Sequence, residues 1–322
     1  MDPSPAPPQR LGYLRETAIV FGYEFAAVWR GVRPLSLLAV YFLGSFLVVG
    51  IFCKFYNAAE EKDMNPEEAK AFIAALLYSS VKDPVQEADG PVFDDEKPAA
   101  GKPHQKPPMP KLSERQDKAV SAVINSTPLP MLFVFWMGIL VTPLFSILMG
   151  FDLLAGDLQH RFIRYLAPRL RPGPMLIGKI LSQVAIQVLI SLITAFCVLA
   201  YFSWQLKGFD AAAAFTAICR FWSLSIPYMA TYVALAAFLS SLTRVPLLAL
   251  LLQLVAIFLL WFLSALASWP PLAFLDYLLP SYYKFGLYSP DPAYFLSSVA
   301  VYTLFASFFT GLAWLVTTRR DR

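Results

Sequence analysis

Side chains that could build a catalytic or metal site are scarce in this chain. It has two histidines, His104 and His160, and three cysteines, Cys53, Cys197 and Cys219, which are scattered and form no Cys-x-x-Cys pair. A zinc site needs clustered histidine, cysteine or carboxylate ligands, and a serine or cysteine nucleophile needs a nearby base. Membrane metalloproteases and Ser/His proteases are therefore disfavoured, and we expect the cysteines to be packing residues.

Charged residues are also scarce, at 15% of the 322 residues, whereas 57% are hydrophobic. This balance is not that of an ordinary soluble domain. Six runs contain no Asp, Glu, Lys or Arg and are long enough to cross a hydrocarbon core of about 30 Å. They are residues 35–53, 130–150, 180–202, 221–242, 246–267 and 295–316. The sequence predicts an all-α membrane protein with six transmembrane helices, in which neighbouring helices or hydroxyls accommodate Pro143 and Pro227.

The absence of charged residues from the six runs also indicates where the energy for any transport comes from. Proton relays, ion-coupling sites and voltage sensors generally place an acid or base within a span, and these six runs have none. Residues 173–180 read GPMLIGKI, which has the G-x-x-x-x-G-K spacing of a phosphate-binding loop but has Ile180 where Ser or Thr should bind magnesium. We therefore expect no cofactor in this chain, and any transport must draw its energy from another protein.

The positions of Lys and Arg predict the orientation. With both termini in the cytoplasm, thirteen of them lie in the inner segments and three, Lys207, Arg220 and Lys284, in the two short outer loops. The remaining ten lie in the long segment 54–129, and long translocated loops are largely exempt from this rule. We expect a multi-pass protein of a bacterial inner (plasma) membrane with cytoplasmic termini. A formal net charge of +4 implies no nucleic acid partner.

Three segments outside the spans have patterns of their own. Residues 1–34 are expected to form a cytoplasmic tail and a helix that lies in the membrane interface. Residues 54–129 are expected to form a large external loop with short helices after Asn65 and Ser113 and a mobile linker between them. That loop is either a platform for cargo or an accessory protein, or a tolerated insertion. Residues 268–294 are expected to form short re-entrant helices in the outer leaflet, as a gate or as an aromatic anchor.

The segment between the second and third spans, residues 151–179, has the clearest pattern. Apolar residues recur in it at helical spacing: Leu153, Leu154, Leu158, Phe162, Tyr165 and Leu166. Asp157, Arg161 and Arg164 share another face, at positions i, i+4 and i+7. This spacing predicts an amphipathic cytoplasmic helix that lies against the inner leaflet or against a docked protein. We expect it to end at three prolines, Pro168, Pro172 and Pro174.

Polar residues within the spans are few. Gln183, Gln187, Ser191 and Thr194 form a stripe on the third span, and Gln253 lies in the middle of the fifth. Such residues should face protein or a cavity rather than lipid. Interhelical hydrogen bonds of roughly 1 kcal/mol each would explain them by packing alone, and lining of a translocation pathway is the alternative.

The order of these segments resembles that of the permease subunits of type-2 ABC (ATP-binding cassette) transporters. The shared order begins with an interfacial helix that contains Glu24 and ends with the basic C-terminal tail. Between them lie a cytoplasmic helix, whose acidic residues precede its basic ones, and Gly178-Lys179, which come directly before the third span. Arg164-Tyr165-Leu166 matches the family's run after the acid Asp157, although Arg161-Phe162 stands where the family has Gly-Thr. The resemblance covers nearly the whole chain except the external loop.

The resemblance implies a permease that pairs with a second copy of itself and with two copies of a separate ABC ATPase. Export is the more common inference for the direction of transport in this family. ATP and magnesium would then bind only to that ATPase. Residues 152–166 would be the coupling helix, which docks in a cleft of the ATPase and transmits its closure to the spans. The implied docking residues are Asp152, Asp157, Leu158, Arg161, Phe162, Arg164 and Tyr165. Membrane lipid and, at the external loop, cargo or an accessory protein are the other expected partners.

Two other classes of function fit parts of the sequence. A membrane anchor or sensor that transports nothing would bind a ligand with its outer helices and recruit a cytoplasmic partner. A lipid-modifying membrane enzyme would need polar residues that converge at the interface, and the candidates are Asp276, Tyr282, Tyr283 and Lys284. These four residues have no recognisable catalytic spacing.

Overall fold

The computed structural model describes residues 12–30, 32–61, 114–159, 171–206, 209–267 and 269–320. Within these ranges every regular element is a helix. The α-helices are α1 (Tyr13–Arg30), α2 (Val32–Glu61), α4 (Glu114–Ser126), α5 (Leu129–Gly150), α6 (Ala155–Gln159), α8 (Pro172–Gln205), α9 (Ala211–Ser241), α10 (Pro246–Leu266) and α11 (Pro292–Arg320). The two 3-10 helices are η1 (Pro270–Leu278) and η2 (Pro280–Tyr288). The predicted all-α class is confirmed for this part of the chain, and the helix predicted after Asn65 lies outside it.

Five helices are long and apolar enough to cross a membrane: α5, α8, α9, α10 and α11. They correspond to the second to sixth predicted spans. The first predicted span, residues 35–53, lies within the 30-residue helix α2, which includes the apolar stretch Ala39–Lys54. These lengths and compositions support a multi-pass membrane protein, and the crossing by α2 stays a prediction.

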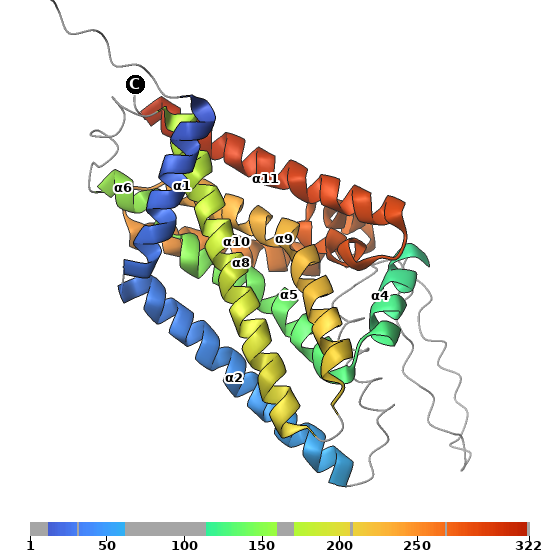
Figure 1. Ribbon diagram of the computed structural model, residues 1–322. Helices are drawn as coiled ribbons and strands as arrows, with labels where there is room; N and C mark the ends of the chain where they lie inside the picture. The colour runs from blue at the N-terminus through green and yellow to red at the C-terminus, as the bar shows by residue number, and fades with distance from the viewer. Residues whose placement is uncertain are drawn as a thin grey trace, which may run out of the picture.

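Helix α9 lies at the centre of the helical bundle. It packs against α5, α8, α10 and α11, and its middle and C-terminal turns are largely buried. Helix α1 packs along α8, and α2 lies against α8 and α5. Figure 1 shows α6 and the C-terminal end of α11 at one end of the bundle, and α4 with the orange η1 and η2 at the other. We call these two ends the α6 end and the η end.

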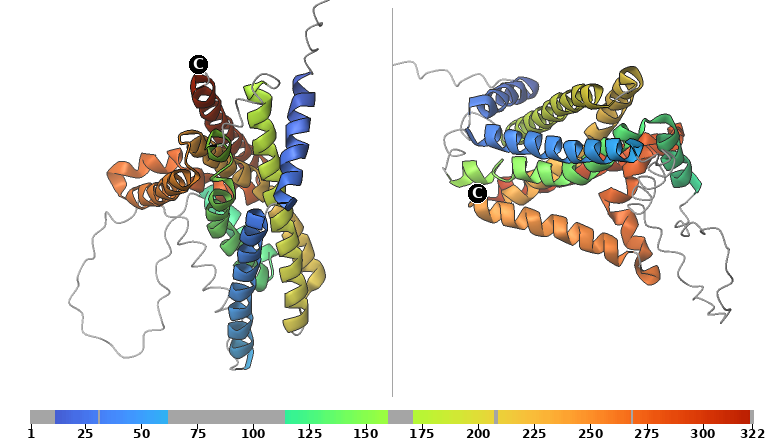
Figure 2. Two further views of the ribbon diagram at one scale, coloured as in Figure 1. Left: turned by 90° about the vertical axis from the view of Figure 1, so that its left-hand side faces the viewer. Right: turned by 90° about the horizontal axis from the view of Figure 1, so that it is seen from below.

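Helix α10 lies along one edge of the bundle, opposite α1 and α8 (Figure 2, right). Its outward face carries large exposed side chains, including Phe258, Trp261 and Phe262. Helix α11 likewise exposes Leu304 and Phe308. Exposed apolar side chains of this size suit contact with lipid or with a second subunit rather than with water.

Local capping and hydrogen bonding explain how proline and polar residues are accommodated. Asp210 caps α9, because its Oδ1 accepts hydrogen bonds from two amides of the first turn, each at 3.0 Å. Inside α5, Pro143 has no amide hydrogen to donate to the carbonyl of Ile139. The hydroxyl of Tyr228 in α9 donates to that oxygen instead, at 3.1 Å. A neighbouring hydroxyl thus accommodates Pro143, as the sequence predicts.

The predicted end of the cytoplasmic helix lies outside the described residues, which resume at Arg171. Pro172 and Pro174 lie in the first turn of the next helix, α8, which begins at Pro172. Proline is tolerated there because the first amides of a helix have no intrahelical acceptor. The predicted coupling helix, residues 152–166, begins only at Ala155, after a turn, and is described as far as Gln159.

Candidate functional site

At the α6 end, Ser240 of α9 holds the turn that leads into α6. Its Oγ accepts hydrogen bonds from the amides of Leu154 and Ala155, at 3.1 and 3.0 Å, and donates to the carbonyl of Phe151 at 2.9 Å. Ser240 is 0% exposed. Because the first amides of a helix lack intrahelical acceptors, this side chain determines where α6 starts and joins it to α9.

The same part of α9 also contacts α5 and α10. A Cβ on Gly150, the last residue of α5, would lie 2.9 Å from the Cβ of Ala236, so glycine permits this close approach. The carbonyl of Ala236 accepts a hydrogen bond from Nε2 of Gln253 in α10, at 2.9 Å. Gln253 and Ala236 are both fully buried. Since Ala236 and Ser240 are about one turn apart, α5, α6, α9 and α10 are joined within a short stretch of α9.

A buried lysine joins α6 to two other helices. Nζ of Lys179, in α8, lies 2.6 Å from Oε1 of Glu24 in α1 and 2.8 Å from Oδ2 of Asp157 in α6. Lys179 is 4% exposed, and the two carboxylates are only partly exposed. An ammonium group buried to this extent needs a partner of opposite charge, and two carboxylates supply it. We call Glu24, Asp157 and Lys179 the Lys179 junction.

Close packing beside the junction places α1 along α8. A Cβ on Gly178 would lie 2.8 Å from the Cβ of Val20 and 3.0 Å from the carbonyl oxygen of Thr17, so only glycine fits without a shift. Glu16 is 2% exposed, and its Oε2 accepts a hydrogen bond of 3.4 Å from the amide of Arg171, the residue before α8. Helices α1, α6 and α8 therefore form one connected unit at the α6 end.

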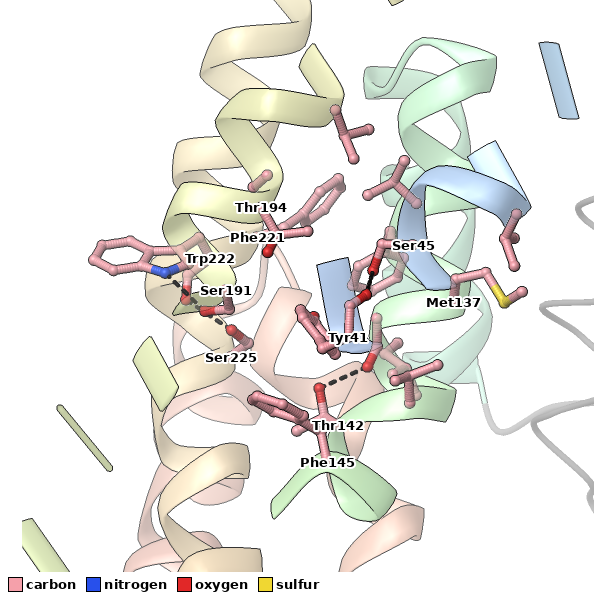
Figure 3. Close-up of a pocket in the computed structure, with 18 of the residues that line it drawn as sticks. Tyr41, Ser45, Met137, Thr142, Phe145, Ser191, Thr194, Phe221, Trp222 and Ser225 are labelled. Atoms are coloured by element: carbon pink, nitrogen blue, oxygen red, sulfur yellow. Dashed lines mark hydrogen bonds between the residues drawn. The ribbon is translucent and has the colours of Figure 1, made fainter. Parts of the chain in front are cut away.

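A cavity of about 460 Å³ lies between α2, α5, α8 and α9, and we call it the intramembrane cavity. Figure 3 shows part of its wall, in which hydroxyl groups lie among apolar and aromatic side chains. The hydroxyls of Ser45 and Thr142 donate to carbonyls of their own helices, at 2.8 and 2.6 Å. The ring nitrogen of Trp222 donates to the carbonyl of Val188 at 3.0 Å and to Oγ of Ser191 at 3.2 Å. Because these polar groups are already hydrogen-bonded, the cavity suits an apolar molecule.

A comparison of the sequence with models of known protein families shows to which family this chain belongs. The family model described as ABC-2 family transporter protein matches residues 19–317. The chain belongs to the ABC-2 transporter family. No curated protein matches its sequence. The predicted resemblance to type-2 ABC permeases is confirmed, and the chain is a membrane permease of an ABC transporter. Membership of this family implies partnership with an ABC ATPase subunit.

The predicted docking residues of the permease lie only partly within the described structure. Asp152 is half-buried in the turn before α6, Asp157 belongs to the Lys179 junction, and Leu158 is half-buried in α6. The other four lie outside the described residues: Arg161, Phe162, Arg164 and Tyr165. The structure thus pairs one predicted docking residue, Asp157, with a lysine of its own chain, and this pair positions α6 against α8.

Sequence reasoning does not predict the pairing within the junction. It singles out Glu24 and Gly178-Lys179 only as markers of the family's order of segments. The signal that could reveal the pairing is charge, because Lys179 lies at the start of an apolar run, where a buried ammonium needs an acidic partner. Glu24 and Asp157 are acids of the two amphipathic segments predicted at the same membrane face.

The polar stripe of α8 divides into two parts in the permease. Gln187 is buried, and its Nε2 donates to Oγ of Ser146 in α5 at 2.6 Å. Gln183 is also buried, about one turn closer to the α6 end. Ser191 and Thr194 line the cavity. The two glutamines therefore lie where helices pack, whereas the two hydroxyl residues lie in the wall of the intramembrane cavity.

Proposed function

We propose that this permease is driven by a separate ABC ATPase that docks at the α6 end, which faces the cytoplasm. Lys and Arg dominate the segments at this end, which supports the orientation. The chain crosses a bacterial inner membrane six times, with α2 as the first span, and pairs with a second copy of itself. Two copies of the ATPase bind ATP and magnesium. The family match favours transport over an anchor, a sensor or a lipid-modifying enzyme.

The Lys179 junction is the observation that carries this proposal. A movement of α6 displaces Asp157, which lies 2.8 Å from Nζ of Lys179. Lys179 is part of α8, and its second partner, Glu24, is part of α1. Movement of the docking segment therefore reaches the third span and the interfacial helix through two charge contacts. Ser240 also connects the turn before α6 to α9, and Gln253 connects α10 to the same part of α9.

The chemistry of the intramembrane cavity supports an apolar cargo. Helix α8 borders the cavity and also carries Lys179, so a shift of the junction changes one wall of the cavity. The hydroxyls of Ser45 and Thr142 are hydrogen-bonded within the protein, so a strongly polar molecule would gain little there. We infer that the permease exports molecules with a large hydrocarbon part.

Site-directed cross-linking tests where the ATPase docks. Gln159 is exposed at the end of α6. In a variant whose native cysteines are replaced, Gln159→Cys should cross-link to a protein with a complete nucleotide-binding loop, identified by mass spectrometry. Asp291→Cys, which is exposed at the η end, is the matched control and should give no such product. Cross-links to an ATPase from Asp291→Cys and none from Gln159→Cys would contradict the proposed orientation.

Ser240→Ala should weaken the connection between α6 and α9. It leaves the buried amides of Leu154 and Ala155 without their acceptor, so we expect a loss of about 1–3 kcal/mol in the free energy of unfolding. Cargo-stimulated ATP hydrolysis by the complex should fall several-fold. Thermal unfolding and ATPase rates of the purified complex measure both effects. Ser203→Ala is the control, because its exposed hydroxyl donates only to the carbonyl of Leu199 in its own helix, at 2.9 Å. Normal stimulation in Ser240→Ala would show that α6 acts independently of α9.

A further inference from the structure

The hydroxyl groups that line the intramembrane cavity differ in their hydrogen bonding. Each described serine and threonine of the wall donates to a backbone carbonyl of its own helix, at 2.6 to 2.9 Å: Ser45, Thr142, Ser191, Thr194 and Ser225. The hydroxyl of Tyr228 donates to the carbonyl of Ile139. Two other tyrosines line the cavity, Tyr41 and Tyr288, and their hydroxyls have no hydrogen-bond partner among the residues that the structure describes.

Tyr41 is the more accessible of these two tyrosines. It is half-buried, and its ring packs against Phe145 with the ring centres 4.2 Å apart (Figure 3). Phe145 lies in the C-terminal half of α5, so Tyr41 is on the side of the cavity nearer the α6 end. Tyr288 belongs to η2 and is 3% exposed, and its ring contacts Phe135 and Phe221. A molecule in the cavity therefore reaches the hydroxyl of Tyr41 more easily.

The wall of the cavity favours an uncharged ligand. The described residues that line it include no acid, lysine, arginine or histidine. A charged group would be left there without a partner, which is costly in a largely apolar site. A tyrosine hydroxyl both donates and accepts, so it can bind a hydroxyl or a carbonyl. The cavity volume, about 460 Å³, lies within the range of about 300–1,000 Å³ that small-molecule sites occupy.

We propose that Tyr41 selects the cargo by forming a hydrogen bond with the single uncharged polar group of an amphiphile, such as a long-chain alcohol. This inference rests on the proposed function and narrows its class of cargo. The polar group lies beside Tyr41, on the side of the α6 end. The hydrocarbon chain extends towards Phe135 and Phe221, which line the cavity on the side of the η end. Burial of the chain supplies most of the affinity, and the hydrogen bond supplies the selectivity.

The side of the cavity next to Tyr41 is open. Val40 of α2 and Leu148 of α5 both line the cavity, and they are 66% and 36% exposed. In the orientation of the proposed function, this opening is in the half of the bundle that contacts the inner leaflet. An amphiphile of that leaflet already has its polar group on the cytoplasmic side and its chain towards the middle of the membrane. It therefore enters the cavity sideways without turning over.

Photolabelling of the purified transporter complex in lipid nanodiscs, without ATP, tests the proposal. Two probes are compared, hexadecanol and hexadecane, which carry a diazirine at the same carbon, and mass spectrometry measures the labelling of cavity peptides. The unmodified permease should favour the alcohol about three- to tenfold, as expected for one hydrogen bond. Tyr41→Phe should lose this preference, because it removes the hydroxyl and keeps the ring on Phe145.

Tyr201→Phe is the matched control. Tyr201 is also half-buried, its ring contacts Phe46 of α2, and it does not line the cavity. This variant should keep the preference for the alcohol. Since both variants are measured with both probes, the different partition of the probes into lipid cancels in the comparison. A misfolded variant loses both probes alike, so continued labelling by hexadecane in Tyr41→Phe separates recognition from misfolding.

Several outcomes would overturn the proposal. An unchanged preference in Tyr41→Phe does so, as does a preference that is lost in Tyr288→Phe instead. Equal labelling of the unmodified permease by both probes excludes recognition of a polar group but leaves the apolar cargo of the proposed function intact. Absence of cavity labelling by either probe contradicts that cargo as well. The docking of the ATPase is tested separately, by the Gln159→Cys cross-link.

Discussion

Lys179→Met should cause one of the two largest losses of stability expected for a single substitution in this permease. It removes the cation between Glu24 and Asp157 and leaves two partly buried carboxylates close to each other. Removing one partner of a buried ion pair typically costs about 3–5 kcal/mol. We expect the lower end, about 3 kcal/mol, because water still reaches both carboxylates. Thermal unfolding of the purified complex measures the loss, and cargo-stimulated ATP hydrolysis should fall with it.

Two further variants separate the role of charge from the role of shape. Lys179→Arg keeps the positive charge and should retain most of the stability. Combining Lys179→Met with Glu24→Gln and Asp157→Asn removes all three charges, and should recover most of the loss, because replacing every member of a buried ion group is milder than removing one. Its ATP hydrolysis should still not respond to cargo, because α6 has lost its charge contact with α8. Recovery of both properties would show that the junction serves the fold alone.

The spans could be predicted from the sequence because their cause is local. A helix that crosses lipid must be long, apolar and hydrogen-bonded within itself, and α5, α8, α9, α10 and α11 meet these conditions. The charge-free run predicted as the first span, residues 35–53, lies within the helix α2. Hydropathy does not determine which spans are neighbours, so the central place of α9 could not be predicted.

In the candidate site, too, the contacts between helices could not be predicted from the sequence. Asp157 can be singled out because its spacing predicts a helix face shared with two arginines. Its contact with Lys179 joins two different helices, and no local period encodes such a contact. Ser240 and Ser241 look alike in sequence, yet Ser240 holds the turn before α6 whereas Ser241 donates to the carbonyl of Phe238 in its own helix. The packing of α9 against that turn decides between the two serines.

Gly178→Leu should separate α1 from α8. A Cβ at this position would lie 2.8 Å from the Cβ of Val20 and 3.0 Å from the backbone oxygen of Thr17, and neither atom can move unless α1 moves. Overpacking of this kind typically costs about 1–3 kcal/mol, and the further bulk of leucine places the expected loss at the upper end. Because Glu24 moves with α1, the Lys179 junction also loses one of its two carboxylates.

Gly178→Ala should show the same effects at smaller size, because it adds only the clashing Cβ. Gly311→Ala in α11 is the control: nothing lies within 4 Å of its Cβ, and alanine favours a helix, so its unfolding temperature should stay the same or rise slightly. Limited trypsin digestion at Arg15, which is exposed on α1, should become faster in Gly178→Leu as α1 leaves α8. Normal digestion, stability and ATP hydrolysis in that variant would mean that coupling does not need α1 on α8. The contact of Asp157 with Lys179 would then be the route from α6 into the third span.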